Sequence, residues 1–162
     1  MPEEETRPRK IVSGGQSGVD RAALDVAEEL SFPRGGWCPR GRYAEDGPIP
    51  DGYPLKETPS PATSQRTEWN VRDSDGTLVL TEGEPSGGTA VTIHFARRHG
   101  KPCLVLDLED DPDPDAAGRW IAEHGIAVLN VAGPRESKCP GIHRRAAAFL
   151  RKALAGKGEG RS

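Results

Sequence analysis

The chain lacks the features that mark a membrane-spanning, disulfide-bonded or zinc-binding protein. Its longest apolar runs, such as residues 78–80 and 103–106, are the length of a strand, far below the roughly 20 residues that cross a bilayer. The three cysteines are widely spaced and form no CxxC pair, which argues against a disulfide framework. The four histidines form no HExxH motif, so we expect no structural metal.

The chain also lacks a strong net charge and an apolar leader. With 22 Lys and Arg against 25 Asp and Glu the net charge is −3, so any hold on an anion must come from a local site. Residues 1–9 are acidic and contain proline, without the apolar core of a signal peptide. We therefore expect a soluble, cytoplasmic protein that interacts with neither nucleic acid nor membrane.

The length of 162 residues is that of one domain. We predict a flexible segment at 1–9, one ligand-binding domain at 10–155, and a flexible, glycine-rich tail at 156–162.

Short apolar runs alternate with helical patterns five times along the domain, which predicts an α/β fold with a mostly parallel five-stranded sheet and helices on both faces. The long segment 40–61 is rich in proline and glycine and has little periodicity. A structureless loop of this length inside a compact domain is usually functional. The expected strands are 10–13, a short strand ending near Cys38, 77–81, 103–108 and 126–132.

Five helices are expected between and after these strands. They start at 19, at Thr63 or Ser64 as the N-cap, at 87–89, near 117, and at 142.

Two glycine-rich loops follow strands and open helices. The first comprises Gly14, Gly15, Gln16, Ser17 and Gly18, and the second comprises Ser86, Gly87, Gly88 and Thr89. Such loops point several backbone N–H groups and the positive end of a helix at one spot, where an anion binds. Both loops follow the carboxyl ends of parallel strands, so we expect them to face a common crevice. The alternative is a pair of tight turns without a ligand.

The start of the long segment and the residues just before it add candidates for contact with a ring system. Trp37, Arg40 and Arg42 suit stacking and charge-assisted contact with an anion, and Glu45 suits a hydroxyl or amine. Cys38 lies beside the same expected crevice. The alternatives are that Trp37 belongs to the core, that the charges are solvated, and that Cys38 is a buried, inert thiol.

The predicted helix before the third strand has one polar face of interest. Arg66 and Asn70 are four residues apart and share a face, whereas Arg72 lies off it. We expect that face to reach the crevice, with a solvated helix and Trp69 in the core as the alternative.

Four stretches of the chain resemble the molybdenum carrier proteins, a circularly permuted YpsA-like branch of the SLOG and lysine-decarboxylase-like superfamily. They are GGQSGVDRAALD at 14–25, GGWCPRGRYAEDGPIP at 35–50, QRTEWNVRDSDGTLVL at 65–80 and SGGT at 86–89, and the resemblance spans about 11–154. It implies a three-layer Rossmann-like fold. It also implies a carrier of the molybdenum cofactor (molybdopterin) or of a related nucleotide, which is usually a homo-oligomer such as a dimer or tetramer.

The resemblance extends to single residues. Gly14, Gly15, Ser17 and Gly18 match the family's first phosphate loop, with Ser17 where threonine is common. The loop 86–89 is similar to the PGGxGT loop of enzymes that release a base from nucleoside monophosphates. Thr92 occupies the position of their catalytic glutamate, and the missing carboxylate argues against hydrolysis by this chain.

Permutation implies a particular order of strands. The turn 133–137 looks like the glycine-arginine turn after the first strand of unpermuted relatives, which would place Gly133, Arg135 and Ser137 at the crevice. Strand 126–132 is almost entirely apolar, as a central strand should be. We therefore predict the order 2-1-5-3-4, with 2-1-3-4-5 as the alternative.

Three functions remain open at this stage. The first is a carrier of molybdopterin or its metal-loaded form, with molybdoenzymes as acceptors. The second is a nucleoside 5′-monophosphate phosphoribohydrolase in which Glu45, Asp46, Glu57 or Glu68 replaces the missing glutamate. The third is a nucleotide-sensing module.

Overall fold

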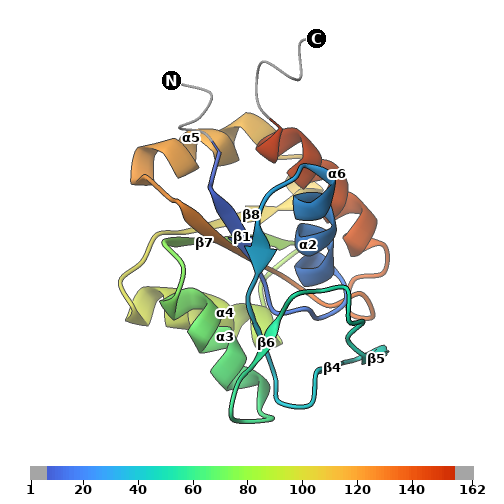
Figure 1. Ribbon diagram of the computed structural model, residues 1–162. Coiled ribbons are helices and arrows are strands. Elements are labelled where there is room, and N and C mark those ends of the chain that lie inside the picture. Colours follow the sequence, from blue (N-terminus) through green and yellow to red (C-terminus); the bar gives the residue numbers. More distant parts are fainter. Residues whose placement is uncertain (1–6, 156–162) are drawn as a thin grey trace.

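The computed structural model describes residues 7–155 and shows a central parallel sheet between two layers of helices (Figure 1). Residues 1–6 and 156–162, which make up most of the predicted flexible ends, lie outside the described residues. The sheet has the order β2-β1-β9-β7-β8. This confirms the predicted order 2-1-5-3-4. The strands are β1 (Lys10–Val12), β2 (Arg34–Gly35), β7 (Gly76–Thr81), β8 (Cys103–Asp107) and β9 (Val128–Ala132).

Five α-helices cover the two faces of the sheet, so the predicted three-layer α/β class is confirmed. In Figure 1, α2, α5 and α6 lie on one face, and α3 and α4 lie together on the other. Within residues 7–155, no helix is both long enough and apolar enough to span a membrane. The helices are α2 (Val19–Glu29), α3 (Thr63–Arg72), α4 (Gly87–Arg98), α5 (Pro114–His124) and α6 (Ile142–Leu154), with a short 3-10 turn η1 (Leu108–Asp110) after β8.

Strand β9 is central because its side chains are buried on both faces. Leu129 pairs with Ile11 of β1 and Val131 pairs with Leu78 of β7, and all four side chains are fully buried. Between them lies one polar side chain, Asn130, whose Nδ2 donates to the Thr77 hydroxyl at 3.2 Å. A polar side chain in such a strand needs a partner, and here it also reaches a cavity described below.

The long segment after β1 and α2 is ordered, so the prediction of a structureless loop over 40–61 was wrong. The second strand predicted for the chain, which was expected to end near Cys38, is divided. Residues 34–35 join the main sheet, and residues 37–38 join a separate sheet. In the segment, β6 (Lys56–Glu57) pairs with β3 (Trp37–Cys38), which precedes the segment, and β4 (Tyr43–Ala44) forms a hairpin with β5 (Gly47–Pro48).

A small apolar cluster and one arginine hold this segment together. Ile49 and Leu55 pack with Cys38 and Ala44 against Leu24 of α2, forming a second core. The guanidinium of Arg42 donates to the carbonyls of residues 49, 50, 53 and 55. These contacts join residues far apart within the segment, so no local periodicity reveals them.

Helix α3 also begins differently from the sequence prediction. Thr63 or Ser64 was expected to cap it, but the N-cap position is Ala62 and no side chain caps the helix. Instead the Gln65 side chain reaches back, and its Oε1 accepts the Ser60 N–H at 2.8 Å.

Candidate functional site

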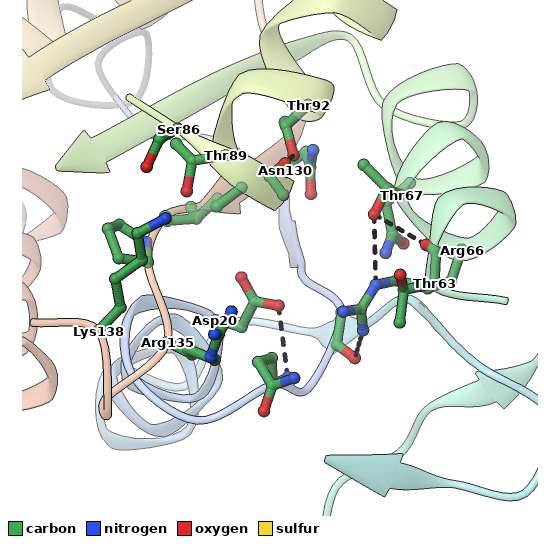
Figure 2. Close-up of a pocket in the computed structure, with 18 residues that line it drawn as sticks. Asp20, Thr63, Arg66, Thr67, Ser86, Thr89, Thr92, Asn130, Arg135 and Lys138 are labelled. Carbon is green, nitrogen blue, oxygen red and sulfur yellow. Dashed lines mark hydrogen bonds between the residues drawn. The ribbon is translucent and has the colours of Figure 1, made fainter. Parts of the chain in front are cut away.

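One cavity of about 210 Å³ opens at the carboxyl ends of β1 and β9, beside the N-termini of α2 and α4. Both glycine-rich loops reach it, as expected for loops at one edge of a parallel sheet. Figure 2 shows Ser86, Thr89 and Lys138 at one side of the cavity, Arg66 with Thr63 and Thr67 at the other, and Asp20 between them. The lining comprises Gly14, Gln16, Asp20, Thr63, Arg66, Thr67, Asn70, Ser86, Gly88, Thr89, Thr92, residues 130–135 and Lys138.

The second glycine-rich loop has the open backbone donors that an anion requires. Helix α4 begins at Gly87 with Ser86 as its N-cap, and no side chain caps it. Within the described part of the chain, the N–H groups of Gly87 and Gly88 donate to no acceptor. A Cβ at Gly88 would meet nothing within 4 Å, so this position faces open space. Unsatisfied N–H groups at a helix N-terminus form an anion site.

The first glycine-rich loop differs, because its backbone donors are used within the protein. The Gln16 N–H donates to Asp20, the Ser17 N–H donates to the Gln16 side chain, and the Val19 N–H donates to the Pro134 carbonyl. The first loop therefore shapes the wall of the cavity, and fewer of its N–H groups are available to a ligand than sequence reasoning assumed.

Glycines of this loop are required by close packing. A Cβ at Gly15, where φ is +83°, would lie 2.5 Å from Leu55 Cδ1. A Cβ at Gly18 would lie 2.4 Å from the Pro134 carbonyl oxygen. The same holds for Gly133 in the neighbouring turn after β9, where a Cβ would lie 2.2 Å from the Leu80 carbonyl oxygen. The first loop thus fits the alternative of tight packing turns, although its Gly14 and Gln16 also line the cavity.

The carboxylate of Glu45, which does not line the cavity, contacts three other predicted site residues. Glu45 accepts hydrogen bonds from the Ser17 hydroxyl at 2.5 Å and from the Ser137 N–H at 3.0 Å. It also pairs with Arg135, whose Nε lies 3.1 Å from Oε1. Hydrogen bonds from the Ser137 and Ser17 hydroxyls hold the pKa of Glu45 below its usual value. Glu45 therefore joins the β4–β5 hairpin to the first glycine-rich loop and to the turn 133–137, and of these contact residues only Arg135 lines the cavity.

Helix α3 presents the predicted pair to the cavity. Arg66 and Asn70 both line it, whereas Arg72 pairs with Asp73 and lies outside the lining. Arg66 is 9% exposed, and its Nη1 donates to the Gly14 carbonyl at 2.8 Å. The Asn70 side chain exchanges two hydrogen bonds with the backbone of Trp37. The i, i+4 spacing thus identified the inward face.

The remaining candidates of the long segment do not line the cavity. The Trp37 indole N–H donates to Asp73 at 2.8 Å, and its ring packs edge-on against Trp69. Cys38 is fully buried, and burial raises the pKa of its thiol, which fits the inert-thiol alternative. Arg42 braces its own segment, and the exposed Arg40 lies beside it in the chain.

Six polar side chains that sequence reasoning did not place at the site line the cavity. Asp20, in the first turn of α2, is 8% exposed, and burial raises the pKa of this carboxyl to about 6 despite Arg66 nearby. Asn130 could have been found from the sequence, because it interrupts an otherwise apolar strand. The others are Thr63, Thr67, Thr92 and Lys138.

The carboxylates nominated for hydrolysis lie elsewhere. Glu45 forms the contacts described above, Asp46 pairs with Arg21 at 2.6 Å, and Glu68 pairs with His99 at 2.9 Å. Glu57 accepts the Gly41 N–H at 2.8 Å. None of the four lines the cavity, and the hydroxyl of Thr92 donates to the Gly88 carbonyl at 3.0 Å.

The residues fit an anionic ligand better than a metal held by protein side chains. Arg66, Arg135 and Lys138 bring three cationic side chains to the lining, against one carboxylate. Across residues 7–155, no group of three or more His, Cys, Asp and Glu side chains is arranged to hold a metal ion.

The fold and the cavity define a Rossmann-like α/β protein with a polar cavity at the carboxyl ends of its strands. The model of the circularly permutated YpsA SLOG family matches residues 11–154, and the chain belongs to this family. A search of curated proteins found no match.

Among solved structures, the chain is similar to the crystal structure of a "putative molybdenum carrier protein" from Syntrophus aciditrophicus SB. The two share 47% sequence identity, with a TM-score of 0.87, and the match covers 91% of this chain and 96% of the other. Family and neighbour together support a carrier or binding role.

Proposed function

We propose that this protein binds and carries a phosphate-bearing heterocycle, with molybdopterin or its metal-loaded form as the first candidate. The observation that carries the proposal is the open N-terminus of α4, where the N–H groups of Gly87 and Gly88 lack acceptors beside Lys138. Ser86 and Thr89 add hydroxyl groups at the same side of the cavity (Figure 2). Together they supply the donors and positive charge that a phosphate group requires.

Similarity to the Syntrophus protein favours a pterin as the heterocycle. The Syntrophus protein carries the description "putative molybdenum carrier protein". The molybdenum cofactor is a pterin that bears a phosphate group. The cavity contains donors for the phosphate and additional polar side chains for a ring system. Molybdenum would travel as cargo on the pterin, and molybdoenzymes would be its acceptors.

A substitution at Gly88 tests the anion site with little risk to the fold. The N–H groups of Gly87 and Gly88 at the N-terminus of α4 are called the nest below. Gly88→Val places a branched side chain in the open space at the nest, because no atom lies within 4 Å of its Cβ position. Gly52→Val is the matched control, since its Cβ position is equally open and lies outside the cavity lining. We expect isothermal titration to show that Gly88→Val loses binding of inorganic phosphate and of nucleoside monophosphates, while Gly52→Val retains it. Unchanged binding by Gly88→Val would refute the proposal.

The hydrolase alternative predicts a different product. Thr92 replaces the expected glutamate, and Glu45, Asp46, Glu57 and Glu68 lie outside the cavity. Incubation of the protein with nucleoside monophosphates should therefore release no free base that chromatography can detect. Steady release that disappears on mutation of one of these four carboxylates would favour the enzyme.

A further inference from the structure

The inner side of the cavity holds two buried side chains of opposite charge around a glycine. A Cβ at Gly14 would lie 2.7 Å from Arg66 Nη1 and 3.0 Å from Asp20 Oδ2. Asp20 is 8% exposed and Arg66 is 9% exposed, and both line the cavity. Within the described residues, they form no direct ion pair within 4 Å. The two charged groups therefore lie side by side without a direct ion pair between them.

Each of the two groups retains hydrogen-bonding capacity toward the cavity. A carboxylate offers about four acceptor positions. Asp20 accepts the Gln16 N–H at 3.3 Å, and Figure 2 shows its carboxylate directed into the cavity. Arg66 uses Nη1 on the Gly14 carbonyl and Nε on Thr67, which leaves Nη2 for a ligand.

We infer that Asp20 and Arg66 form an acceptor and donor pair that recognises a group with a hydrogen-bond donor next to an acceptor on the phosphate-bearing ligand. A cyclic lactam offers this pattern through its N–H and C=O, as in guanine and pterins, and a vicinal diol of a sugar offers it through two hydroxyls. Arg66 donates to the acceptor atom, and Asp20 accepts from the donor atom. The inference rests on the proposed function, because the phosphate would occupy the nest at α4.

The charge of Asp20 agrees with an acceptor role. Burial raises the pKa of this carboxyl, but Arg66 and Arg21 both oppose the shift. At neutral pH the group is therefore ionised and can accept a hydrogen bond. A carboxylate that served only to hold Gln16 would not need to lie in the cavity, and its charge there opposes phosphate binding.

The test compares ligands that differ in one chemical group. The probes are inorganic phosphate, ribose 5-phosphate, AMP and GMP, and GMP differs from AMP in its lactam. The variant is Asp20→Asn, which keeps the shape and one acceptor oxygen for Gln16. Asp115→Asn, an exposed position outside the lining, controls for the loss of one negative charge. Isothermal titration at pH 7.5 gives the affinity of each protein for each probe.

We expect Asp20→Asn to bind inorganic phosphate more tightly and to lose about tenfold or more in selectivity for GMP over phosphate, the effect of one charge-assisted hydrogen bond. A loss confined to GMP would assign the lactam, and an equal loss for ribose 5-phosphate, AMP and GMP would assign the diol.

If the wild type binds all four probes and Asp20→Asn leaves their relative affinities unchanged, the inference is overturned and the phosphate nest stands. If the wild type binds none of the four probes, the proposed function fails as well.

Discussion

The buried carboxylate of Asp20 should make the protein less stable at neutral pH than it would be with a neutral group. Burial raises the pKa of Asp20 from its usual 3.8 to about 6. Below pH 3.8 the carboxyl is protonated in both folded and unfolded chains and has no effect. Above pH 6 it is ionised in both states, but the folded state then contains a poorly solvated charge. Ionisation of Asp20 therefore lowers the free energy of unfolding as the pH rises from about 4 to about 6.

The size of the effect follows from the two pKa values. A difference of about two pH units, at about 1.36 kcal/mol per unit, corresponds to about 3 kcal/mol at neutral pH. Asparagine resembles the protonated carboxyl and does not ionise. Asp20→Asn should thus match the wild type near pH 4 and be more stable by about 3 kcal/mol at pH 7.5.

Equilibrium urea unfolding of both proteins between pH 4 and 7.5 measures this difference. Phosphate must be absent from the buffer, because a ligand of the folded state would add its own stabilisation. All other titrating groups are shared, so the change in the difference with pH reports Asp20. A difference that stays constant from pH 4 to 7.5, or a variant that is less stable at pH 7.5, would refute the account of Asp20 as a strained, buried charge.

Three further predictions separate the roles assigned to the loops and to α3. Arg66→Ala should weaken binding of GMP in isothermal titration, and Arg66→Lys should weaken it less. Arg72→Ala should match the wild type because Arg72 lies outside the lining, and equal affinity in all three variants would remove α3 from the site. Gly15→Val should lower the melting temperature measured by circular dichroism, because its Cβ would overlap a leucine side chain at a φ of +83°; a wild-type melting temperature would contradict this. Ser17→Ala should cost about 1 kcal/mol of stability in urea unfolding while ligand affinity stays within about twofold, since the hydroxyl binds Glu45; a large loss of affinity would place it in the site.

The order of the strands was predictable from the family resemblance, and the inward face of α3 was predictable from a local pattern. The apolar character of residues 126–132 and the resemblance to a permuted family placed that strand at the centre of the sheet, and the structure shows it there. The spacing of Arg66 and Asn70 identified the side of α3 that lines the cavity. Helical periodicity alone identified the face of α3, whereas the strand order also needed the resemblance.

The two glycine-rich loops have similar sequences but different roles: the first uses its N–H groups within the protein, and the second, among the described residues, leaves two of them without an acceptor. This difference was not predictable from the sequence. The first loop uses its N–H groups on Asp20, Gln16 and Pro134, and these partners become neighbours only after the chain folds. Asp20 itself looked ordinary, because an acidic residue in the first turn of a helix commonly balances the helix dipole. The ordered segment 40–61 escaped detection because Arg42 and the second apolar cluster act across many residues.

The central claim, that the nest at Gly88 holds a phosphate-bearing heterocycle, is tested most directly by identifying what the protein carries. Wild type, Gly88→Val and Gly52→Val, purified from the same cells, would be denatured and the released molecules analysed by mass spectrometry, with molybdenum measured in parallel. The account predicts a phosphate-bearing pterin or nucleotide with the wild type and with Gly52→Val, and its loss from Gly88→Val, whose side chain fills the open space at the helix terminus. Release of the same molecule in equal amount from all three proteins, or of none from the wild type, would contradict it.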